Sequence, residues 1–101
     1  MKLTQAELAD RYTILCLKRE HGLPVEEDVS QYAAELMQVD CSELLTVNRR
    51  MWELEDQISQ TTDLAEIGAL YLELRAWTLQ RVAAKNRIAE RCGEPREVKG
   101  Y

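Results

Sequence analysis

Apolar residues recur along most of this chain with the alternating three- and four-residue gaps that are typical of amphipathic helices. Four segments carry the pattern: one begins at Thr4, one runs from Val25 to Val39, one begins at Asp40, and one runs from Asp63 to Gly93. The last would be about 28 residues long, or ~42 Å at 1.5 Å per residue. The pattern predicts an all-α protein, a small helical bundle of about four helices, with residues 1–101 forming a single helical domain.

Three of the predicted helices open with the same start signal. Thr4, Asp40 and Asp63 are each followed three residues later by a glutamate and then by an apolar residue. In such a capping box the first side chain binds a free amide of the first turn, and the glutamate reaches back to the first residue. We therefore expect helices to begin at these three points. Gly22 and Gly93, each with a proline two residues later, predict the ends of the first and last helices.

The short connection after Ile58 predicts that the last two helices form a long antiparallel hairpin. If the turn centres near residues 61 and 62, residue i of the third helix faces about residue 123 − i of the fourth. This register predicts three contacts: Trp52 with Tyr71, Asn48 with Arg75, and Glu43 with Arg81. The far end of the fourth helix then needs a second cover, which we expect from Leu8, Tyr12 and Leu15 of the first helix.

Composition and charge narrow the classes of function. The chain has 101 residues and a net charge of −5, with acids concentrated in residues 20–66 and bases in residues 75–99. This balance argues against nucleic-acid binding, which needs a basic face without nearby acids. No apolar run is long enough for a membrane span or a signal peptide. Cys16, Cys41 and Cys92 show no disulfide or zinc-site spacing, so we expect a cytoplasmic protein with free thiols.

Polar residues interrupt the apolar stripes at a few places that could form a site. Asn48, Trp52 and Glu55 share one face of the third helix, and cationic side chains recur on the first and last helices. Two interpretations remain open: a polar seam that fixes the register between helices, or a pocket that binds a small anion. The residues concerned are Arg11, Lys18, Asn48, Trp52, Glu55, Arg81 and Lys85.

No motif assigns catalysis. Glu53 and Asp56 have the spacing of a magnesium-binding pair in helical pyrophosphatases, but the second acidic pair of such a site is missing. His21 is the only histidine, and its place next to Gly22 favours a role in capping a helix. The stretch "LKREHGLPV" is locally similar to helical chorismate mutases, whose long helix comes first and not last. We expect no catalytic residue, metal site or cofactor.

A wider resemblance covers nearly the whole chain. The order of "LTQAELADRYTILCLKREH", "LLTVNRRMWELEDQI", "LRAWTLQRVAAKNRI" and "EVKGY" resembles an uncharacterised family of small all-helical bacterial proteins. The positions that match its motifs are Glu7, Asp10, Arg11, Ile14, Lys18, Asn48, Trp52, Glu55, Asp56, Arg81, Lys85, Ile88, Glu97, Lys99 and Tyr101. Leu79 and Gln80 depart from it, because an Asn-Asp type pair is expected there.

This resemblance implies a shared helical fold and no particular activity, together with a link to glycosyltransferase and surface-polysaccharide genes. We expect a non-enzymatic, self-associating helical interaction module, with a homodimer as its main assembly and another protein as a further partner. The alternative is a helical-bundle enzyme or small-anion binder with a pocket between its helices. We also expect Val98 or Tyr101 of the tail to fold back onto the bundle or onto a partner chain.

Overall fold

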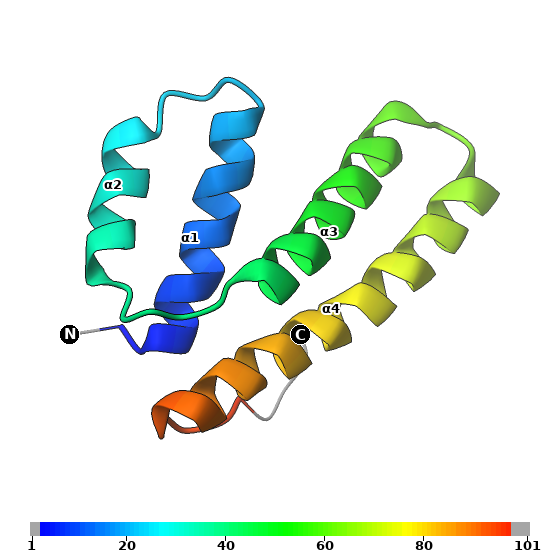
Figure 1. Cartoon of the computed structure of the whole chain (residues 1–101). Helices are drawn as coiled ribbons and strands as arrows, with labels where there is room; N and C mark the ends of the chain where they lie inside the picture. The colour runs from blue at the N-terminus through cyan, green and yellow to red at the C-terminus, as the bar shows by residue number, and fades with distance from the viewer. Residues whose placement is uncertain (1–2, 98–101) are drawn as a thin grey trace.

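The computed structural model describes residues 3–97, and within them the chain forms four helices and no strand. The helices are α1 (Gln5–Glu20), α2 (Glu26–Glu35), α3 (Ser42–Gln60) and α4 (Leu64–Cys92). In Figure 1, α2 lies beside α1, whereas α3 lies beside α4, and the long α4 also passes the start of α1. The prediction of an all-α protein with a long last helix is confirmed.

Two of the three predicted start signals cap helices. Thr4 accepts a hydrogen bond from the Glu7 amide at 3.1 Å, and Asp63 accepts one from the Ala65 amide at 3.0 Å. The third helix begins one residue later than predicted, since α3 starts at Ser42 with Cys41 before it. The Asp40 carboxylate still accepts from the amide and the hydroxyl of Ser42, at 2.9 and 2.7 Å, two residues on, as Asp63 does from Ala65.

Helix α2 is shorter than its apolar spacing predicted, because a contact from α1 ends it. The Gln5 side chain donates to the Glu35 carbonyl at 3.2 Å and accepts from the Met37 amide at 2.8 Å. These bonds satisfy backbone groups that one more helical turn would otherwise use. The chain leaves the helix at Leu36, which is extended, and Gln38 takes a positive φ of 47°.

Small residues let three helices approach one another closely. The core cluster places Leu44 of α3 against alanines of α1 and α4 and against Ile88, its members being Ala6, Ala9, Leu44, Ala84, Ile88 and Ala89. Helix α1 covers this end of α4 as expected, but through Ala6 and Ala9. None of the predicted residues Leu8, Tyr12 and Leu15 belongs to this cluster, and Tyr12 and Leu15 are only half-buried. The small side chains of Ala6 and Ala9 make this face of α1 flat, so that α4 can pack closely against it.

The outer half of the α3 and α4 pair extends away from the rest of the molecule. No residue from 55 to 83 is fully buried, and we call this part the arm. Figure 1 shows its tip, residues 61–63, on the side away from α1 and α2. The radius of gyration is 14.7 Å, against about 13 Å for a compact domain of this size. None of the helices within residues 3–97 combines the length and apolar character that crossing a membrane requires.

Two ion pairs show which residues of α3 and α4 lie opposite each other. Arg50 binds Glu73 at 2.6 Å, as the turn at residues 61 and 62 implies. Glu43, however, binds Arg87 at 2.6 Å, so its expected place near Arg81 is wrong. Side chains lean toward the start of their own helix. In two helices that run in opposite directions, this brings Glu43 and Arg87 toward each other.

Candidate functional site

Polar side chains are buried together where α1, α3 and α4 meet. Asp10 and Lys85 are each only 4% exposed, and Thr13 and Asn48 are buried beside them. The Asn48 amide donates to the Asp10 carboxylate at 3.0 Å and to the Thr13 hydroxyl at 2.9 Å. The predicted bond from Asn48 to Arg75 is therefore wrong, because α1 and not α4 supplies its partners. We call Glu7, Asp10, Thr13, Asn48, Lys85 and Glu97 the polar cluster.

Lys85 holds the polar cluster together through three carboxylates. Its ammonium lies 2.9 Å from Glu7, 3.1 Å from Glu97 and 4.0 Å from Asp10. Burial is the largest single influence on the pKa of Lys85 and lowers it. The hydrogen bonds to Glu7 and Glu97, with the charges of Asp10 and Glu7, outweigh burial and leave that pKa above its usual value. Lys85 is therefore a charged, structural residue.

The chain after Gly93 turns back onto the bundle and completes this cluster. The Glu94 carboxylate accepts hydrogen bonds from the Gln5 and Ala6 amides, at 2.6 and 3.1 Å, and so caps the start of α1. Asn86 and Glu97 exchange two bonds, at 2.7 and 3.0 Å. The expected contacts of Val98 and Tyr101 lie outside the described residues.

We expect the polar cluster to make the fold sensitive to acid. The hydrogen bond from Lys85 is the main cause that lowers the pKa of Glu7. Ionised Glu7 therefore stabilises the fold above its unfolded pKa of about 4.3, and this contribution is lost as the pH falls through the lower, folded pKa. Urea unfolding between about pH 5 and pH 3 should show a shallower pH dependence for Glu7→Gln than for the parent. Glu27→Gln, at an exposed carboxylate without an ion pair in residues 3–97, should keep the parent's slope.

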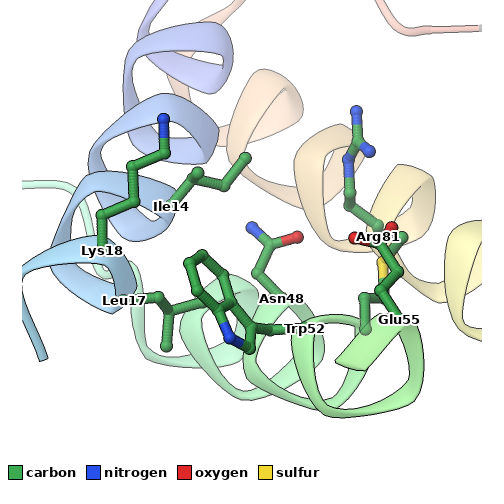
Figure 2. A pocket seen from close by; sticks show the side chains of 8 residues that line it. Ile14, Leu17, Lys18, Asn48, Trp52, Glu55 and Arg81 are labelled. Atoms are coloured by element: carbon green, nitrogen blue, oxygen red, sulfur yellow. The ribbon is translucent and has the colours of Figure 1, made fainter. Parts of the chain in front are cut away.

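A cleft of about 280 Å³ opens beside the polar cluster, between α1, α3 and α4. Figure 2 shows Lys18 on one side, Arg81 on the other, and Asn48 and Trp52 between them. Five of the predicted site residues line this cleft, together with apolar neighbours: Ile14, Leu17, Lys18, Asn48, Met51, Trp52, Glu55 and Arg81. The other two lie elsewhere, since Arg11 is exposed on α1 and Lys85 is in the polar cluster.

Trp52 forms a wall of the cleft because α1 holds it there. Its indole stacks on the His21 imidazole with the ring centres 4.4 Å apart. His21 ends α1, and its Nδ1 lies 2.7 Å from the Leu17 carbonyl, which fixes the ring against the helix. The aromatic partner of Trp52 is therefore His21 of α1 and not the predicted Tyr71, with which it forms no aromatic pair in residues 3–97.

Arg81 links the cleft to the polar cluster. Its Nε lies 3.4 Å from the Asp10 carboxylate, within ion-pair distance. The geometry is too poor for a hydrogen bond, and this Nε is the one buried side-chain nitrogen or oxygen among the described residues without a hydrogen-bond partner. No residue from 3 to 97 binds the two terminal nitrogens of the guanidinium. Within residues 3–97, Arg81 therefore has donors without a partner, which another group could bind.

The predicted site residues did not include the acidic half of the site, although the resemblance matched Glu7, Asp10 and Glu97 to its motifs. Asp10 and Thr13 lie on the buried face of α1, at three- and four-residue gaps from Ala6, Ala9 and Leu17. A charged residue inside a stripe of small apolar residues is a signal that could have found Asp10. Helical spacing gives no such signal for Glu97, which follows Pro95 in a segment without regular structure, and only the resemblance pointed to it.

The outer face of α4 on the arm is not covered by any other residue from 3 to 97. Large apolar side chains are exposed there, with Leu64 at 82%, Tyr71 at 55%, Leu72 at 70% and Leu79 at 57%. At 100° per residue these positions fall on one side of the helix, together with Gly68 and Arg75. We call this set, Leu64, Gly68, Tyr71, Leu72, Arg75 and Leu79, the outer stripe.

Comparisons of the chain with protein-family models, curated proteins and solved structures find no match. What the chain does is therefore inferred from its own contacts and surfaces.

Proposed function

We propose that the chain is a non-enzymatic helical module that pairs with a second copy of itself, with the two α4 helices antiparallel along the outer stripe. The arm has no fully buried residue, although its outer stripe carries four large, exposed apolar side chains in one line. Contiguous exposed apolar patches on a helix are typical of interaction surfaces. A partner helix would remove this surface from water.

The spacing of the outer stripe favours a second copy as that partner. Its gaps from Leu64 to Leu79 are four, three, one, three and four residues, so they read the same in both directions. A two-fold interface requires a patch that complements itself. With the axis between Tyr71 and Leu72, Leu64 faces Leu79 of the other copy, and Gly68 faces Arg75. This palindrome is the observation that carries the proposal.

Charge and small side chains agree with this orientation. Over the facing residues 64–79, α4 carries Glu66 and Glu73 as its acids and Arg75 as its one base. An antiparallel pair places Arg75 of one copy opposite Gly68, two residues from Glu66 of the other, and it also opposes the two helix dipoles. A side chain at Gly68 would meet nothing within 4 Å of its Cβ, so this chain's own packing does not need a glycine there. The glycine leaves room for Arg75 of the second copy.

Cysteine cross-linking tests both the pairing and its direction. In a Cys41→Ser/Cys92→Ser background, we expect a mixture of Leu64→Cys and Leu79→Cys chains to form a disulfide-linked heterodimer on mild oxidation. The reason is that these positions meet across the proposed axis, within reach of the short Cα separations that a disulfide needs. Each variant alone should give little covalent dimer. A Leu64→Cys chain that links to itself as readily would contradict the antiparallel arrangement.

A negative charge at the centre of the outer stripe tests the interface, and the same charge elsewhere on the surface is the matched control. Leu72→Asp changes both copies at once and so removes two buried leucines, worth about 1.5 to 3 kcal/mol each. The dimer should weaken by about a hundredfold or more in sedimentation equilibrium, and the cross-link should be lost. Met37→Asp introduces the same charge at a residue that is 73% exposed outside the arm, and it should change neither result. Equal effects of the two variants would overturn the proposal.

A further inference from the structure

Two cations on adjacent turns of α4 have very different surroundings. Lys85 meets three carboxylates, whereas Arg81, one turn earlier, meets only Asp10 through an Nε that forms no hydrogen bond. Across the cleft, Lys18 has no ion pair or hydrogen bond with any residue from 3 to 97. One side of the cleft is therefore bordered by Lys18, which has no counter-charge among residues 3–97. The other side is bordered by Arg81, which is paired with Asp10 but whose terminal guanidinium nitrogens have no hydrogen-bond partner among those residues.

The floor between these cations is rigid and largely apolar. The His21 stack fixes Trp52, and the bonds to Asp10 and Thr13 fix Asn48. Ile14 and Leu17 of α1 and Met51 of α3 complete the lining. Figure 2 shows the side chains of Lys18 and Arg81 rising on either side of this floor. Ligand pockets typically combine an apolar lining with a few fixed polar groups.

We propose that this cleft binds a small ligand that joins one anionic group, a carboxylate or a phosphate monoester, to a compact apolar body. The anion lies between Lys18 and Arg81, whose guanidinium still has free donors for an oxyanion. The apolar body lies against Trp52 and Ile14. Arg11 and Lys85, which the sequence grouped with these residues, take no part.

Size and charge limit the ligand further. A cavity of roughly 150 Å³ holds benzene in another protein, so about 280 Å³ suits a ring that carries one small substituent. Glu55 adds a carboxylate to the edge of the cleft. A second anionic group near it would be repelled, which favours a ligand with a single carboxylate or phosphate group over a polyphosphate.

Titration with simple probes tests this site directly. In a Trp77→Phe background Trp52 is the remaining tryptophan, so its fluorescence reports on the cleft. The probes are benzoate, phenyl phosphate, inorganic phosphate and benzamide, each up to about 10 mM, at which even a ligand with a Kd of about 1 mM saturates. We expect saturable binding of benzoate or phenyl phosphate, and the tighter of the two identifies the anion. Benzamide, with the ring but no charge, and inorganic phosphate, with the charge but no ring, should each bind at least about tenfold more weakly.

Matched variants assign the binding to this cleft. Lys18→Met keeps an unbranched stem and removes the ammonium, so it should weaken benzoate or phenyl phosphate about tenfold. Arg19→Met removes one charge from the next position of α1, outside the cleft, and should leave the affinity unchanged. Thermal unfolding checks that both variants are folded. The proposal is overturned if neither ring-bearing anion binds, if benzamide or phosphate alone binds as well, or if the two variants behave alike.

Discussion

Replacing Lys85 with methionine should destabilise the protein by about 3 kcal/mol or more in urea unfolding at pH 7. Removing one partner of a buried charge pair typically costs about 3 to 5 kcal/mol, because the other charge stays buried without compensation. Asp10, only 4% exposed, is that charge here. Arg81 still lies 3.4 Å from it, which places the expected loss at the lower end of the range. Domains of this size are stable by about 5 to 15 kcal/mol, so the variant should remain folded.

A lysine-to-methionine change at an exposed site is the control. It separates the effect of losing the buried charge of Lys85 from the effect of replacing a lysine side chain by methionine. Lys18→Met alters an ammonium that has no ion pair in residues 3–97, and its stability should stay within about 0.5 kcal/mol of the parent. Adding Asp10→Asn to Lys85→Met removes the uncompensated carboxylate and should recover part of the loss. A loss below about 1 kcal/mol for Lys85→Met would mean that Asp10 is not held by this lysine.

Local signals in the sequence predicted the helices well wherever neighbouring helices do not intervene. Thr4 and Asp63 cap α1 and α4 as expected, and Gly93 ends α4 with a φ of 67°. The failures have tertiary causes. The Gln5 side chain ends α2 by donating a hydrogen bond to the carbonyl of Glu35, its last residue. The positive φ of Gln38 could not be predicted, because such a conformation is usually signalled by a glycine. No rule based on spacing alone contains such a contact from another helix.

The candidate site was predicted in part, because helical spacing identifies a face and not the helix that covers it. Asn48 and Trp52 were correctly placed on one face of α3, but the specific partners predicted for them were Arg75 and Tyr71 of α4. The structure shows that α1 supplies Asp10, Thr13 and His21 to that face. For α4, the spacing predicted an end that needs a cover from α1, but not an exposed outer stripe. The burial pattern divides α4 into an end that packs on α1 and an arm whose outer stripe stays exposed.

Asn48→Asp should be nearly as damaging as the loss of Lys85, with a pH dependence of its own. The parent amide donates to Asp10 at 3.0 Å, and the variant places a second carboxylate there. Two carboxylates at this distance cannot both ionise without a large penalty, so the pKa of one is strongly raised in the folded state. Relative to the parent, we expect a loss of about 3 kcal/mol at pH 7 in urea unfolding.

The sign of the pH effect makes this prediction specific. A folded pKa above the unfolded value of about 3.9 means that the penalty is small near pH 4, where the pair can share a proton, and grows as the pH rises. Asn48→Ala loses the same hydrogen bonds without adding a charge, so its deficit of about 1 to 3 kcal/mol should not change between pH 4 and 7. If Asn48→Asp is as stable as the parent at pH 7, the two cations beside Asp10, which are Arg81 at 3.4 Å and Lys85 at 4.0 Å, must be able to neutralise two carboxylates. An Arg81 guanidinium engaged in this way would be less available to a ligand in the cleft, so this one variant also bears on the binding site.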